Sequence, residues 1–88
     1  MVRVLLVTSE GCKPCSRVKR VFSELQSEMP SLIVETVDLT SPVGTKLALD
    51  NQILYPPAVF IESKLFGKGK IDASRMVESI RNVNGSQS

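Results

Sequence analysis

The chain has 88 residues, of which 42% are hydrophobic, and a formal net charge of +2. This length accommodates one domain with a modest core and leaves no room for a second domain. The charge is too small to indicate nucleic-acid binding by itself. The apolar run Val4 to Val7 is far too short for a secretion signal or a membrane span. We therefore expect a monomeric cytoplasmic protein that binds neither nucleic acid nor membrane.

The N-terminal part of the sequence predicts a strand followed by a helix. Val2 to Thr8 is predicted to be a strand, because its residues Val4 to Val7 are continuously apolar, which is typical of a strand buried on both faces. The only two cysteines, Cys12 and Cys15, come a few residues later. Apolar residues then recur with helical spacing, and this predicts a helix from Cys12 or Lys13 to about Glu28.

The C-x-x-C pattern at a helix start indicates redox chemistry. Cysteines at positions i and i+3 of a first helical turn have Cα atoms about 5–6 Å apart, a separation that a disulfide accepts. Pro14 between them is compatible with a first turn, where the missing N–H costs nothing. Free N–H groups and the helix dipole lower the energy of a thiolate there. In the cytosol, such a pair is more often catalytic than structural.

Three other uses of the cysteine pair stay open. A structural disulfide from Cys12 to Cys15 would close a very short loop and restrict the unfolded chain little. Four-coordinate zinc needs two more ligands, and the chain has no histidine and no third cysteine. Zinc, like an iron–sulfur cluster, would therefore have to be shared between two chains. The redox-active pair is the hypothesis that we favour.

The rest of the sequence predicts three more strands and two more helices, in the overall order β-α-β-α-β-β-α. The strands are Leu32 to Leu39, Ala58 to Ile61 and Leu65 to Phe66, and the helices are roughly Val43 to Asn51 and the segment after the N-cap Asp72. The second strand should be parallel to the first, because a helix connects them. Gly67 to Lys70 is predicted to be a flexible basic loop. The domain is expected to span residues 1–82, with a polar tail at 83–88.

This order of elements, the positions of Cys12 and Cys15, and a proline before the third strand resemble the thioredoxin/glutaredoxin superfamily over nearly the whole chain. The resemblance implies an α/β thioredoxin-like fold in its minimal, glutaredoxin-type form: a four-stranded mixed sheet flanked by three helices. It also implies a cis proline that faces the cysteines. The pattern places it at Pro57, with the Tyr55–Pro56 bond as the alternative.

The same resemblance implies a dithiol–disulfide oxidoreductase in which Cys12 is the nucleophile and Cys15 the resolving thiol. Disulfide-containing proteins or glutathione mixed disulfides would be the substrates. Glutathione or a flavin-dependent thioredoxin-type reductase would supply electrons, and no bound cofactor or metal is expected. The alternative function is a non-enzymatic module that carries an iron–sulfur cluster or a metal between chains.

Substrate contacts are expected from Lys13, Pro56 and Pro57. In relatives, the residue before the cis proline offers its backbone N–H and C=O to the substrate. Pro56 has no N–H to donate, so binding should depend more on charge from Lys13 and the Gly67 to Lys70 loop. Glu10 stands where glutaredoxins carry a lysine that holds glutathione. The resemblance therefore supports redox chemistry in this chain more strongly than it supports the use of glutathione.

Overall fold

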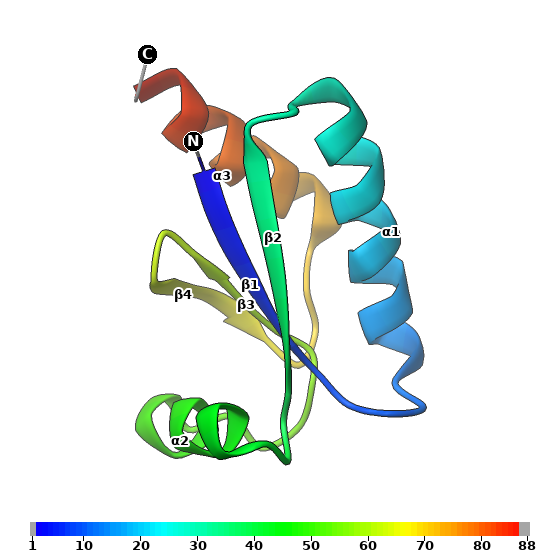
Figure 1. Cartoon of the computed structure of the whole chain (residues 1–88), viewed down its shortest axis with the longest axis vertical. Helices are drawn as coiled ribbons and strands as arrows, with labels where there is room; N and C mark the ends of the chain where they lie inside the picture. The colour runs from blue at the N-terminus through cyan, green and yellow to red at the C-terminus, as the bar shows by residue number, and fades with distance from the viewer. Residues whose placement is uncertain (1, 87–88) are drawn as a thin grey trace.

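The computed structural model of the chain describes residues 2–86. Its elements are β1 (Val2–Thr8), α1 (Lys13–Glu28), β2 (Leu32–Asp38), α2 (Pro42–Asn51), β3 (Ala58–Ile61), β4 (Lys64–Lys68) and α3 (Ala73–Ser86) (Figure 1). This order is the one that the sequence predicts. One difference lies at the C-terminal end, where α3 continues through positions 83–86 that we expected to form a polar tail. Residues 87 and 88 of that predicted tail lie outside the described residues.

The four strands form one mixed sheet in the order β2-β1-β3-β4. β1 pairs in parallel with β2, since α1 supplies the long crossover that a parallel pair needs. β3 is antiparallel to both β1 and β4. A two-residue turn at Glu62 and Ser63, with φ of 50° and 68°, joins β3 to β4 in the manner of a type I′ hairpin. The expected α/β fold with a four-stranded mixed sheet is confirmed.

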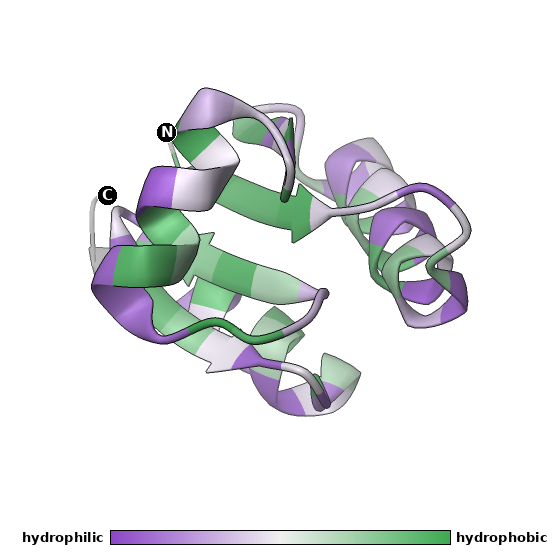
Figure 2. Ribbon diagram, turned by 90° about the horizontal axis from the view of Figure 1, so that it is seen from below, coloured by the Kyte–Doolittle hydropathy of each residue, from purple (hydrophilic) through white to green (hydrophobic). Residues whose placement is uncertain are grey.

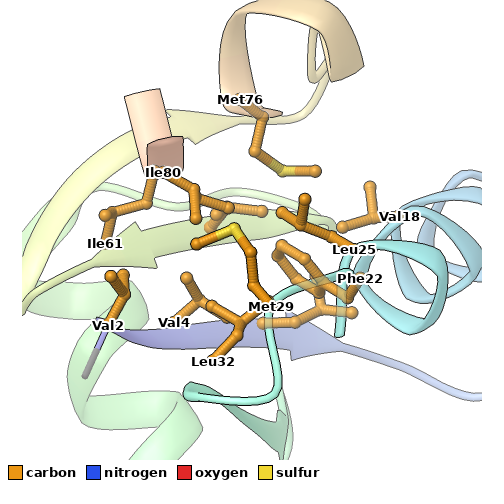
Figure 3. Packing of buried hydrophobic residues seen from close by; sticks show 12 residues of the cluster. Val2, Val4, Val18, Phe22, Leu25, Met29, Leu32, Ile61, Met76 and Ile80 are labelled. Atoms are coloured by element: carbon orange, nitrogen blue, oxygen red, sulfur yellow. The ribbon is translucent and has the colours of Figure 1, made fainter. Parts of the chain in front are cut away.

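β1 is covered on both faces, because its side chains alternate between two apolar layers. Val2, Val4 and Leu6 face α1 and α3, whereas Val7 belongs to a smaller cluster on the α2 side. The larger layer combines side chains from β1, β2, β3, α1 and α3, which meet in Figure 3. The buried members from the helices and the α1–β2 connection are Val18, Phe22, Leu25, Met29, Met76 and Ile80.

The distribution of hydropathy follows from these two layers. Figure 2 shows strands that are mostly hydrophobic and helices that alternate between hydrophobic and hydrophilic residues. The predicted apolar stripe of α1 is confirmed, since Val18, Phe22 and Leu25 are buried. No helix within residues 2–86 is long and apolar enough to cross a membrane.

The junction between β2 and α2 is fixed by local hydrogen bonds and by one close backbone contact. The Ser41 hydroxyl accepts from the Gly44 N–H at 3.1 Å and caps α2. Thr40 donates to the Asp38 carboxylate through its hydroxyl at 2.6 Å and its N–H at 2.7 Å. These two bonds hold the pKa of Asp38 below its ordinary value. Gly44 is buried, and a Cβ added there would overlap the Asp38 carbonyl group.

We predict that Gly44→Ala destabilises the protein by about 1–3 kcal/mol, because the added methyl group forces α2 away from the end of β2. Gly85→Ala is the matched control: this glycine is also helical, and nothing lies within 4 Å of a Cβ placed there. It should leave stability unchanged or raise it by up to about 1 kcal/mol through helix propensity. Urea unfolding of the three proteins measures both effects. Equal stability of the Gly44 variant and the parent would contradict the close contact.

Candidate active site

The sheet topology brings three chain segments to one edge. Val7 near the end of β1 pairs with Ala58 at the start of β3, and Ala58 pairs with Lys68 at the end of β4. The loop to Cys12 follows β1, Pro57 directly precedes β3, and Gly69 directly follows β4. All three segments therefore lie at the same end of the sheet. A hydrogen bond from the Gly69 N–H to the Pro57 carbonyl, at 2.7 Å, joins two of the three segments.

The two cysteines stand at the start of α1 and form a disulfide. Gly11, with φ of +78°, turns the chain into the helix, a conformation that glycine adopts without strain. Cys12 is the N-cap, and its Sγ accepts from the Cys15 N–H at 3.2 Å. The Cα atoms are 5.3 Å apart, inside the range that the sequence predicts.

The two sulfur atoms differ in accessibility. Cys12 is partly exposed, whereas Cys15 on the inner side of α1 is only 1% exposed. In the reduced protein, the N–H of Cys15 and the positive end of the helix favour a thiolate on Cys12. In this arrangement the Cys12 thiol can contact an external disulfide, whereas the Cys15 thiol is buried beneath it.

The proline loop before β3 provides the opposite side of the site. The peptide bond between Pro56 and Pro57 is cis, as the sequence pattern indicates, and the alternative at Tyr55–Pro56 is not the one observed. Pro57 is buried and Pro56 is half-buried. Pro57 and Pro14 line the same groove, so the loop and the C-x-x-C segment enclose a common space.

This groove has a volume of about 450 Å³ and a largely apolar surface. Val18 and Val21 of α1 and Ile71 from the segment before α3 contribute apolar side chains to its lining. The ring of Tyr55 packs against Gly69, where an added Cβ would come within 3.0–3.3 Å of the ring and hydroxyl. We call this space, lined also by Pro14, Arg17, Pro57, Gly69, Lys70 and Ala73, the proline groove.

A second, more open depression of about 400 Å³ is lined by Cys12 itself, whereas neither cysteine lines the proline groove. Lys13 lines this depression together with Glu10 and Lys19. Among the predicted substrate residues, Pro57 therefore lines the proline groove, whereas Lys13 and Pro56 do not. Their roles stay predictions.

The sequence interpretation did not assign Arg17 or Tyr55 to the site, and both line the proline groove. Arg17 could have been found from its spacing, because it follows Pro14 by three residues on α1 and so lies on the same side of the helix. Tyr55 carries no local signal of this kind. Its ring packs on Gly69, a residue fourteen positions away in the sequence.

The predicted flexible basic loop is wrong in its first half. Gly67 and Lys68 belong to β4. The Lys68 ammonium group donates to the backbone carbonyls of Asn51 at 3.2 Å and Gln52 at 2.9 Å. Lys68 therefore caps the C-terminal end of α2, where backbone carbonyls without a partner in the helix favour a cation.

Within residues 2–86, no group of three or more histidine, cysteine, aspartate or glutamate side chains could hold a metal ion. The cysteine pair thus has no further ligands of these types nearby in its own described chain. A cluster shared between two chains stays a hypothesis.

Comparison with solved structures shows that the chain has the thioredoxin-like fold. It is similar to thioredoxin from Trypanosoma brucei brucei, with a TM-score of 0.72, 18% identity, and coverage of 97% of this chain and 76% of that one. It is also similar to oxidised thioredoxin O1 from Arabidopsis thaliana, with a TM-score of 0.70, 19% identity, and coverage of 93% and 77%. Oxidised mitochondrial thioredoxin 3 from Saccharomyces cerevisiae gives a TM-score of 0.69, 16% identity, and coverage of 92% and 77%. No protein-family model matches the sequence, and no curated protein matches it.

We predict that Cys12 is the more reactive thiol of the reduced protein, because it is more exposed than Cys15 and stands at the helix start. The measurement is the rate of alkylation against pH for the Cys12→Ser and Cys15→Ser variants. The variant that keeps Cys12 should react at least about tenfold faster near neutral pH, with a thiol pKa below the ordinary value of about 8.5. Faster reaction of the variant that keeps Cys15 would reverse the assignment.

Proposed function

We propose that this protein is a thiol–disulfide oxidoreductase that reduces disulfides in other proteins. The observation that carries this proposal is the disulfide between partly exposed Cys12 and buried Cys15 at the start of α1, beside a groove that includes Pro57. The thioredoxin-like fold supports it, since the oxidised thioredoxins among the similar structures share this architecture.

The reaction requires two successive thiol–disulfide exchanges. The Cys12 thiolate attacks one sulfur of the substrate disulfide, so a mixed disulfide forms and the other substrate sulfur leaves as a thiolate. The Cys15 thiolate then attacks the Cys12 sulfur, and the second substrate thiolate leaves. Two electrons pass to the substrate, its two thiolates take up protons, and the Cys12–Cys15 disulfide remains. The short separation of the two Cα atoms, 5.3 Å, allows the second step without a large backbone movement.

The oxidised protein must be reduced again for turnover. We propose that glutathione or a flavin-dependent thioredoxin-type reductase supplies the two electrons, and that the protein acts in the cytoplasm as a monomer. A reducing compartment supports net reduction of substrates, because its thiol pool keeps the cysteine pair in the dithiol form.

The direct test is reduction of a model protein disulfide with NADPH as the final electron donor. One reaction contains glutathione and glutathione reductase, and the other contains a thioredoxin reductase. The parent protein should support NADPH consumption in at least one system, and Cys12→Ser in neither. Equal rates for the parent and Cys12→Ser would contradict the proposal. The system that responds identifies the electron source.

We predict that Cys15→Ser accumulates mixed disulfides with substrate proteins, because attack by Cys12 is intact and resolution is lost. Cys12→Ser should accumulate few, since Cys15 is 1% exposed. Non-reducing electrophoresis after incubation with an oxidised substrate measures the trapped species. Similar trapping by both variants would remove the distinction between nucleophile and resolving thiol.

A further inference from the structure

The proline groove combines an apolar interior with two cations. Its apolar lining includes Val18, Val21 and Ile71, and its charged lining residues are Arg17 from α1 and Lys70 from the loop before α3. No carboxylate lines the groove. The two cations therefore come from segments 53 positions apart in the sequence and border one space that Pro14, a residue between the two cysteines, also lines.

These cations have no counter-ion in the described part of the chain. The ion pairs within residues 2–86 are Arg3–Glu35, Lys46–Asp50 and Arg81–Glu28, none of which involves a groove residue. A cation that is not already paired is free to bind an incoming carboxylate.

Two carboxylates near these cations in the sequence have other contacts or line another space. Asp72, next to Ile71, accepts from the Arg75 N–H at 3.1 Å and caps α3. Glu10 lines the separate depression, where Lys13 and Lys19 accompany it. Neither lines the proline groove, so the charge at its border is positive.

We infer that the proline groove selects substrates in which acidic and apolar residues flank the attacked cysteine, with Arg17 and Lys70 as the residues that recognise the carboxylates. The apolar lining receives the neighbouring aliphatic side chain, and the cations attract the acidic one. This inference rests on the proposed function, since it names the substrate class of the same site. Charge complementarity of this kind mainly raises the rate of productive encounter and is weakened by salt.

The test uses peptide disulfide dimers of sequence Ala-Leu-X-Cys-X-Leu-Ala, in which X is Glu or Lys. The measured quantity is the second-order rate constant for oxidation of the pre-reduced protein, divided by the rate with dithiothreitol to remove the intrinsic reactivity of each peptide. The Glu peptide should react about threefold to tenfold faster than the Lys peptide at low salt, a range consistent with two exposed charge pairs. The ratio should approach one at about 0.5 M salt.

A double variant, Arg17→Gln with Lys70→Gln, should lower the Glu-to-Lys ratio to below about twofold. The matched control is Lys46→Gln with Lys64→Gln, which removes the same amount of positive charge from residues that do not line the groove. This control should keep the preference. A ratio near one for the parent protein would overturn the inference. So would an equal loss of preference in the control, because the effect would then come from net charge alone.

A binding measurement separates this inference from the proposed function. The oxidised protein is titrated with the same peptides carrying serine in place of cysteine, and the methyl signals of Val18, Val21 and Ile71 are followed by NMR. Tighter binding of the Glu peptide in this titration, together with no reduction of the cysteine peptides in the rate assay, would support the selection by the groove and contradict the oxidoreductase. Reduction of both peptides at equal rates, with no difference in binding, would support the oxidoreductase and overturn the selection of acidic substrates.

Discussion

The burial of β1 on both faces is the constraint on which the rest of the structure depends. Val4 and Leu6 point into the layer beneath α1 and α3, and Val7 points into the layer on the α2 side. A slip by one residue would move the exposed Arg3 into the larger apolar layer, so the register of β1 is strongly specified. The end of β1 is therefore fixed relative to the sheet, and the loop that leads to Cys12 starts from a rigid position.

The assembly of the site follows from strand direction. An antiparallel partner begins where β1 ends, so Pro57 arrives beside the loop to the cysteines. β4 returns antiparallel to β3 and ends at the same edge, where the Gly69 N–H bonds to the Pro57 carbonyl. Three separate segments thus come together although no local sequence pattern predicts that they are neighbours. Sites at the ends of strands gain precision in this way, because packed elements hold their flanking loops.

The two cysteines show how one short helix start can give two different thiols. The N-cap residue lies outside the helix and faces solvent, whereas the residue three positions later lies on the inner side of α1. Val18, Phe22 and Leu25 bury this side of α1, so the packing of the helix determines which sulfur is covered. The basic residues at this end of α1 oppose the helix dipole, and one of them, Arg17, lines the proline groove, where we assign it to substrate recognition.

The sequence by itself determined the order of the elements, the bounds of β1, α1 and β3, and the placement of Cys12 and Cys15 at a helix start. These features depend on hydrophobic period, on capping residues and on spacing within a few positions, all of which are local. Only the tertiary structure decided that Tyr55 packs on Gly69, that Arg17 and Lys70 border one groove, and that Lys68 is held by the end of α2. The physical reason is that these contacts join distant segments, and their geometry is set by strand pairing and core packing across the whole fold.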